Sequence, residues 1–180
     1  MRSLWYCPAM NERKIILIAF FTALIIVGSF IRVPLPPVPI TLQTLFVLMV
    51  GFIGGPAIAS MSVFMYLILG AIGLPVFSGG GGFALIFGPT GGYLLALLPA
   101  TWIASLGGSE KIWRMILFGV LATGVIYLGG VLMLKTALSL TLTQAIVTGM
   151  LPFLIGDGIK LGLAIALSRR FAFRVRSLLA

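Results

Sequence analysis

Residues 152–160 read PFLIGDGIK and place one acid, Asp157, and one base, Lys160, inside a chain that is otherwise strongly apolar. On a helix, residues three positions apart lie about 60° apart around the axis and about 4.5 Å apart along it, so both side chains project from one face. Each would cost about 2.5–3.5 kcal/mol at the centre of a membrane helix, so neither should face lipid. Two interpretations are open: an ion pair that holds helices together, or a ligand site buried in a helix bundle.

The composition around this stretch is typical of a membrane protein. Of the 180 residues, 61% are hydrophobic and only 8% are charged, and several apolar runs approach the length that spans a bilayer. The length suits one domain. We therefore predict an all-α, polytopic membrane protein with a single membrane domain over residues 11–180. Residues 1–10 are interpreted as an N-terminal extension.

The titratable and metal-binding side chains exclude several classes of function. The chain has no histidine, Cys7 is the only cysteine, and the only acids are Glu12, Glu110 and Asp157. A disulfide within the chain is impossible, and neither a metal site nor a cofactor is expected. An enzyme is not expected either, because the sequence has no nucleophile–base pair and no second acid for a pocket.

Six apolar segments predict six transmembrane helices. They cover residues 14–31, 41–53, 57–72, 92–105, 113–134 and about 152–168. Thr41 is a candidate N-cap for the second helix, and Gly54-Gly55-Pro56 should form a tight turn before the third. Residues 141–150 should form a short interfacial or re-entrant piece. The alternative for the last span is a helix from Gln144, which would place Asp157 at mid-membrane.

Two loops between the spans are unusual. Residues 32–40 contain four prolines, which lack the N–H that a helix needs, so this loop should be stiff and extended. Residues 76–93 contain four consecutive glycines, Gly79–Gly82, followed by the apolar run Phe83–Phe87. So long a loop in a compact membrane protein favours a function. We expect a flexible lid, closed over the bundle by Phe83–Phe87, in preference to a plain linker.

The basic residues predict which side of the membrane faces the cytoplasm. With six spans both termini share a side, and that side carries nine of the twelve lysines and arginines. Arg32 and Lys135 lie opposite and Lys160 lies within a span, so the positive-inside rule predicts that both termini are cytoplasmic. The net charge of +9 is therefore interpreted as anchoring at the bilayer and not as nucleic-acid binding. The proline loop, the glycine loop and Asp157 would then meet in a pocket open to the outside.

Four motifs, in order along the chain, carry a family resemblance. They are Val38–Thr44, Gly70–Phe77 with the glycine run after it, Gly88–Tyr93, and Gly156-Asp157 with Lys160. With them the chain resembles the BioY family, the biotin-binding S components of energy-coupling factor (ECF) transporters. The resemblance implies a six-helix fold in the prokaryotic cytoplasmic membrane and capture of biotin at the outer face. It also implies partners: a membrane coupling protein (EcfT type) and two ATPases (EcfA type).

The chemistry of biotin assigns candidate roles within this resemblance. Asp157 would accept hydrogen bonds from the urea N–H groups, because charge-assisted bonds in a dry pocket are strong. Lys160 would bind either the urea carbonyl or the valerate. The other candidates for polar contact, ring packing or cover of the ligand are Gln43, Thr41, Tyr93, Phe87, Gly80 and Gly81. For the polar start of the second span, which also includes Thr44, helix capping and hydration at the membrane boundary are equally good interpretations.

Ala19 and Ala23 form a patch of small residues on the first span. Alanines at i and i+4 allow another helix to approach closely, and they match the alanine motif with which the family's first helix contacts the coupling protein. Two alternatives to a biotin S component remain. One is a solitary biotin facilitator or channel, which a lid and a buried charged pair argue against. The other is an S component for a different vitamin, thiamine or riboflavin.

Overall fold

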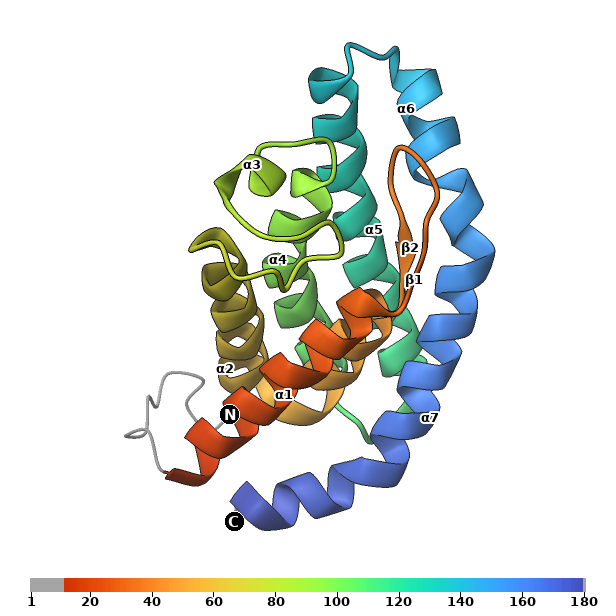
Figure 1. Cartoon of the computed structure of the whole chain (residues 1–180). Helices are drawn as coiled ribbons and strands as arrows, with labels where there is room; N and C mark the ends of the chain where they lie inside the picture. The colour runs from red at the N-terminus through yellow and green to blue at the C-terminus, as the bar shows by residue number, and fades with distance from the viewer. Residues whose placement is uncertain (1–11, 180) are drawn as a thin grey trace.

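The structure, a computed structural model, describes residues 12–179, so the predicted extension over residues 1–10 lies outside the described residues. Within them the chain folds into a bundle of helices with one small β-hairpin (Figure 1). The elements in order are α1 (Glu12–Phe30), β1 (Arg32–Val33), β2 (Ile40–Thr41), α2 (Gln43–Ala71), α3 (Phe83–Ile86), α4 (Gly91–Gly107), α5 (Ile112–Ala137), α6 (Leu142–Gly149), the 3-10 turn η1 (Leu151–Phe153) and α7 (Leu154–Leu179).

The helices have the length and composition of membrane spans. Within residues 12–179, four stretches are long and apolar enough to cross a membrane: α1, α2, α5 and the run Leu142–Val175. Helix α4 is apolar but shorter. The predicted class, a mostly helical membrane protein, is confirmed. The number of crossings and the side on which the termini lie remain predictions.

Helix α2 contains the boundary expected between the second and third spans. Gly55 has φ 68° and ψ 174°, a conformation outside the helical region that glycine tolerates, and Pro56 follows it. The predicted tight turn is therefore a kink that joins two helical arms. A Cβ at the neighbouring Gly51 would lie only 2.7 Å from that of Ala104, so small side chains allow α2 and α4 to pack closely.

The start of the last helix is set by a break after α6. Thr141 caps α6: its Oγ1 accepts from the Gln144 N–H at 3.3 Å, and the Gln144 side chain accepts from the Thr141 N–H at 3.0 Å. Met150 then leaves the helical region, with φ −129° and ψ −53°, and Pro152 begins the next turn. The predicted break near Pro152 is confirmed, and a continuous helix from Gln144 is wrong.

The glycine loop folds back on the bundle through Phe77. This side chain is buried, and its ring lies edge-on to that of Tyr66 with 5.3 Å between the centroids. The ring occupies the space above Gly70, where a Cβ would lie 2.0 Å from it. The Gly82 N–H donates to the Gly70 carbonyl at 2.7 Å. The loop is thereby tied to the end of α2.

The run Phe83–Phe87 does not close the lid in the predicted way. It forms the short helix α3, in which Ile86 is buried while Phe83 is 62% exposed. Phe87, immediately after α3, is 73% exposed. A single helical turn cannot direct all of its side chains inward, so only one side of the run packs against the bundle.

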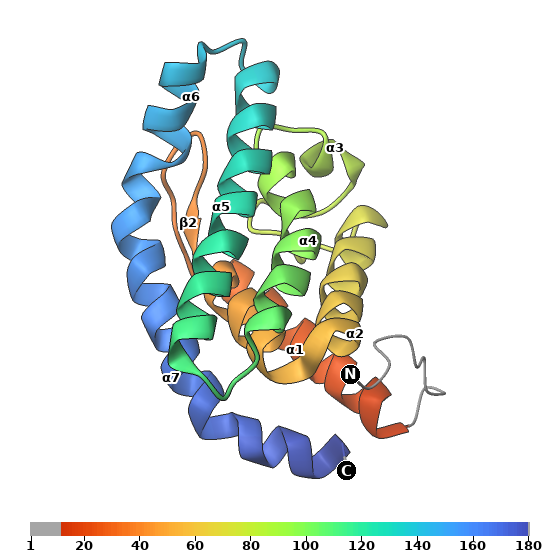
Figure 2. The same ribbon diagram turned by 180° about the vertical axis from the view of Figure 1, so that it is seen from behind.

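The loops and the termini lie at opposite ends of the bundle. In Figure 1 the β-hairpin, α3 and α6 lie toward one end, and the start of α1 and the end of α7 lie toward the other. Figure 2, the view from behind, shows the same arrangement, with the end of α7 turning across the base of the bundle. This placement brings the proline and glycine loops to the same part of the molecule, as predicted.

Candidate functional site

The last helix faces the bundle with a stripe of side chains, some polar and some apolar. The buried residues are Phe153 at the end of η1 and, in α7, Asp157, Lys160, Ala164 and Ser168, and they follow the three-to-four spacing of one helix face. The acid and the base therefore share the inner face, as their spacing predicts. Neither lies on the outer surface, since Asp157 is 8% and Lys160 is 6% exposed.

The carboxylate of Asp157 has a partner at each oxygen. Its Oδ1 lies 2.7 Å from the Nζ of Lys160, and its Oδ2 accepts a hydrogen bond from the Tyr127 hydroxyl at 2.5 Å. Tyr127 comes from α5 and is itself buried. A buried carboxylate is tolerated only when it is paired and hydrogen-bonded. The three side chains meet this condition within the protein, and we call them the charged cluster.

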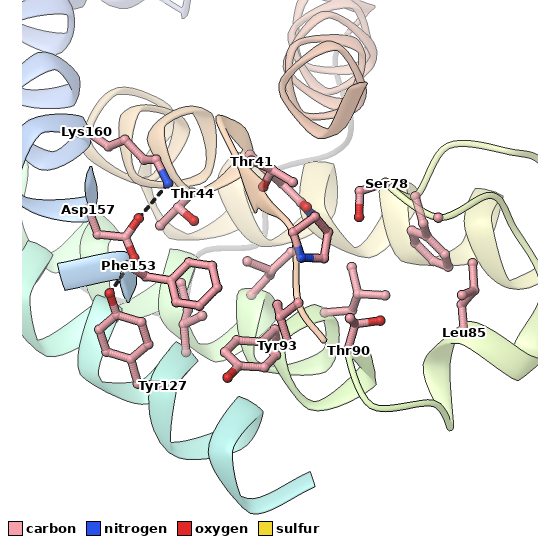
Figure 3. Close-up of a pocket in the computed structure, with 18 residues that line it drawn as sticks. Thr41, Thr44, Ser78, Leu85, Thr90, Tyr93, Tyr127, Phe153, Asp157 and Lys160 are labelled. Atoms are coloured by element: carbon pink, nitrogen blue, oxygen red, sulfur yellow. Dashed lines mark hydrogen bonds and ion pairs between the residues drawn. The ribbon is translucent and has the colours of Figure 1, made fainter. Parts of the chain in front are cut away.

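The charged cluster forms one end of a cavity (Figure 3). The space between its lining atoms, open solvent at the mouth included, amounts to about 680 Å³. In Figure 3, Ser78 and Leu85 of the glycine loop lie at the other end, with Tyr93 between the two ends. The ion pair and the ligand site are thus compatible interpretations, because one pair of residues forms both the bridge and the cavity wall.

Most of the predicted site residues meet at this cavity. Asp157, Lys160, Gln43, Thr41 and Tyr93 all line it, although they come from α7, β2, the start of α2 and α4. The loops and helices therefore bring together residues that are more than a hundred positions apart in sequence, as the prediction of a shared pocket requires.

Three predicted residues do not reach the cavity wall. Phe87 is exposed, and the glycine loop contributes Ser78 and Gly79 in place of Gly80 and Gly81. The two glycines instead shape the loop. Gly80 has φ 127°, and a Cβ at Gly81 would lie 2.2 Å from the Leu74 carbonyl oxygen.

Tyr93 contributes its ring and not its hydroxyl. The hydroxyl donates to the Gly149 carbonyl at 2.7 Å, which ties α4 to α6. The ring fits against α5 because Gly130 has no side chain: a Cβ there would lie 2.1 Å from the ring. Both roles expected for Tyr93 remain predictions; with its donor used at Gly149, the arrangement favours ring packing.

The polar start of α2 does not cap the helix. Thr41 belongs to β2, and Leu42 precedes the first helical residue without any side-chain cap bond. Thr41, Gln43 and Thr44 instead line the cavity, so the capping interpretation is wrong. Gln43 is 6% exposed, and within residues 12–179 its Nε2 makes no hydrogen bond of full geometry, although its side chain interacts with the Tyr66 hydroxyl. An unsatisfied buried donor in a cavity wall is suited to an acceptor on a ligand.

Tyr127 was missed by the sequence analysis. Its hydroxyl lies inside an apolar helix, and a buried tyrosine hydroxyl usually requires a partner. A lone acid elsewhere in a membrane bundle also requires donors. Each signal was present, but the sequence does not show that the two residues, 30 positions apart, face each other.

Comparison with known proteins gives the family. A family model described as the BioY family matches residues 2–177. The chain belongs to the BioY family. A probable biotin transporter BioY from Pyrococcus horikoshii is 42% identical to it over 162 residues, which cover 89% of this chain and 97% of that protein. The biotin transporter BioY from Thermotoga maritima is 38% identical, with 88% and 95% covered.

The fold agrees with a solved structure. The S component for biotin from an ECF-type ABC transporter, determined at 2.1 Å, matches this BioY-family chain with a TM-score of 0.78 and 32% sequence identity. The match covers 91% of this chain and 94% of that one. Together with the apolar helices, the family membership makes this chain a multi-pass protein of the cell membrane. The family comprises transporter subunits and not enzymes.

Proposed function

We propose that this chain is the biotin-binding S component of an ECF transporter. The observation that carries the proposal is the charged cluster of Asp157, Lys160 and Tyr127 in the wall of a mostly apolar cavity. A buried ionisable group in a membrane bundle is a functional site by default. The names of the relatives and of the similar solved structure support biotin as the ligand.

The edge of a cyclic urea matches the adjacent acid and base. In such a ring each N–H donor lies beside the carbonyl acceptor. Asp157 and Lys160 present an acceptor beside a donor, held 2.7 Å apart. A carboxylate oxygen has two lone pairs, and the bonds to Lys160 and Tyr127 use one on each oxygen. Asp157 would therefore accept from a urea N–H while Lys160 donates to the urea carbonyl, which favours this role for Lys160 over contact with the valerate.

The rest of the cavity suits the less polar parts of biotin. Phe153, Leu97 and the ring of Tyr93 offer apolar surface for the thioether ring and the tail. Gln43 would donate its unsatisfied N–H to an oxygen of the ligand. A ligand that is mostly apolar, with a few fixed polar groups, is the kind that such a cavity binds.

We further infer six crossings with both termini in the cytoplasm. The two arms of α2, together with α1, α4, α5 and α7, supply six helices. Arg169, Arg170 and Arg174 are exposed on the end of α7, near the start of α1, and basic residues concentrate on the cytoplasmic side. The cavity would then face outward, as substrate capture requires.

The outer face of α1 would dock the membrane coupling protein. Ala19 and Ala23 are exposed, between the large exposed side chains of Ile15, Phe20 and Val27. Small residues in an apolar stripe allow a second membrane helix to approach closely. The coupling protein (EcfT type) and two ATPases (EcfA type) would complete the transporter, in keeping with the transporter class of the similar solved structure.

A binding experiment tests the proposal. The purified chain in detergent is titrated with biotin, desthiobiotin, thiamine and riboflavin, next to Asp157→Asn and a control acid variant outside the cavity, Glu110→Gln. We expect biotin to bind best and Asp157→Asn to weaken it about 100-fold, since truncating a buried charged hydrogen-bonding group has an effect of this order. Absence of biotin binding, or an Asp157→Asn variant as tight as the parent, would contradict the assignment.

An uptake experiment separates the S component from a solitary facilitator. Cells that express the chain with and without the coupling protein and ATPases are compared for accumulation of labelled biotin. We expect accumulation only with the full module, and expect Ala19→Leu/Ala23→Leu to abolish accumulation without changing the affinity for biotin. Uptake by the chain alone would favour the facilitator.

A further inference from the structure

Tyr127 lies where the biotin cavity meets a second hollow. It lines the cavity, and it also lines an apolar hollow between α5 and the start of α7, with Val120, Gly124 and Leu154. Asp157 lines both spaces as well. The bond between the Tyr127 hydroxyl and Asp157 therefore forms part of the partition between them.

The second hollow opens to the outside of the bundle between α5 and the start of α7. Val120 is 56% exposed, and a Cβ at Gly124 or at Gly158 would meet open space, so the hollow faces the outside of the bundle. Helix α5 and the run Leu142–Val175 are apolar enough to cross a membrane, and polar groups that face hydrocarbon must find partners within the protein. The Oδ2 of Asp157 has such a partner in the Tyr127 hydroxyl, at 2.5 Å.

We propose that Tyr127 is a positioning residue for biotin binding, which rests on the proposed function of the cavity. Its hydroxyl holds Oδ2 while Lys160 holds Oδ1, so the carboxylate is fixed at two points and its remaining lone pairs are directed to the ligand. With one of these donors removed, the carboxylate can rotate about its terminal bond. The Lys160 ammonium can then spread over both oxygens and compete with the urea N–H.

The first test removes the donor and then restores it. Tyr127→Phe keeps the ring but removes the hydroxyl; we expect the Kd for biotin to rise about tenfold, as for a lost hydrogen bond to a charged group. Replacement of Tyr127 by p-aminophenylalanine returns an N–H donor to the same place and should recover most of the affinity. Thr123→Val is the control on the same helix, since it removes a hydroxyl that donates to the Gly119 carbonyl at 2.9 Å and does not line the cavity; it should leave the affinity unchanged.

Two outcomes of this test would overturn the proposal. One is a Tyr127→Phe variant that binds biotin as tightly as the parent. The other is a loss of affinity that p-aminophenylalanine does not restore, because the donor would then not be the cause.

A second measurement separates this proposal from the proposed function. Detergent unfolding midpoints are compared for the parent, Tyr127→Phe, Asp157→Asn and the double variant, without any ligand. We expect the Tyr127→Phe effect to shrink in the Asp157→Asn background, because contacting residues are not additive. If the parent fails to bind biotin, the proposed function falls, while this coupling still supports the contact. Additive effects would overturn the positioning role whatever the ligand.

Discussion

The two polar parts of the cavity wall differ in whether the protein satisfies their hydrogen bonds. On the side of α5 and α7, each oxygen of Asp157 has a partner. On the side of α2, Gln43 is equally buried, yet in the described part of the chain its Nε2 makes no hydrogen bond of full geometry and interacts only weakly with the Tyr66 hydroxyl. An uncompensated buried charge would cost about 3–5 kcal/mol, and an unsatisfied neutral donor about 1–3 kcal/mol. A buried charged group must therefore be paired in the ligand-free protein, whereas a neutral amide can remain unpaired until a ligand binds.

The strongest test of this contrast is to break the pair from its basic side. Lys160→Met leaves the carboxylate of Asp157 buried with Tyr127 alone, and we expect the free energy of unfolding in detergent to fall by about 3–5 kcal/mol. The double variant Lys160→Met/Asp157→Asn should recover most of this loss, because it removes both charges. Lys111→Met, at an exposed position, is the control. A single variant as stable as the parent would show that the pair is not needed for folding.

The wall between the two polar parts can be disturbed sterically. Gly130→Ala places a Cβ 2.1 Å from the Tyr93 ring. We expect a loss of about 1–3 kcal/mol in stability, as for other overpacked sites, and a weaker affinity for biotin. Gly124→Ala, on the same helix but facing open space, should be neutral or stabilising by up to about 1 kcal/mol. Equal effects of the two variants, measured by unfolding and titration, would show that Tyr93 does not depend on Gly130.

Loss of the Gln43 amide should affect stability in the opposite direction from loss of the Lys160 ammonium. Gln43→Leu removes the unsatisfied donor, so we expect unchanged or higher stability but about tenfold weaker binding of biotin. Ser60→Ala removes a hydroxyl that is also buried without a partner in residues 12–179 but does not line the cavity; it should leave the affinity unchanged. A loss of stability in Gln43→Leu would mean that the amide has a structural role.

The smallest effect should come from Tyr93→Phe. It removes the bond to the Gly149 carbonyl but keeps the ring in the cavity wall. We expect stability to fall by about 0.5–1.5 kcal/mol with little change in affinity. Tyr127→Phe should instead reduce the affinity for biotin more than it reduces stability. Titration of both variants side by side, with their unfolding midpoints, tests this difference between the two tyrosines.

The sequence alone determined the features that depend on local patterns. The apolar runs located the long helices and the membrane class, the proline at position 152 marked the break before the last helix, and the three-residue spacing placed Asp157 and Lys160 on one face. Family motifs pointed to biotin. The helices, the break and the shared face follow from the chain's composition or from the geometry of a single helix, so no information about neighbouring elements was needed; biotin was implied by the family resemblance alone.

Only the tertiary structure decided which groups meet. In the folded chain Asp157 is hydrogen-bonded to Tyr127, and the Tyr93 hydroxyl is bonded to Gly149. Phe77, and not Phe87, is the buried side chain that anchors the glycine loop. A helix pattern shows which face is turned inward, but not which residue of another helix lies opposite. That choice depends on the packing of several elements at once, and a uniformly apolar chain gives few local signals of it.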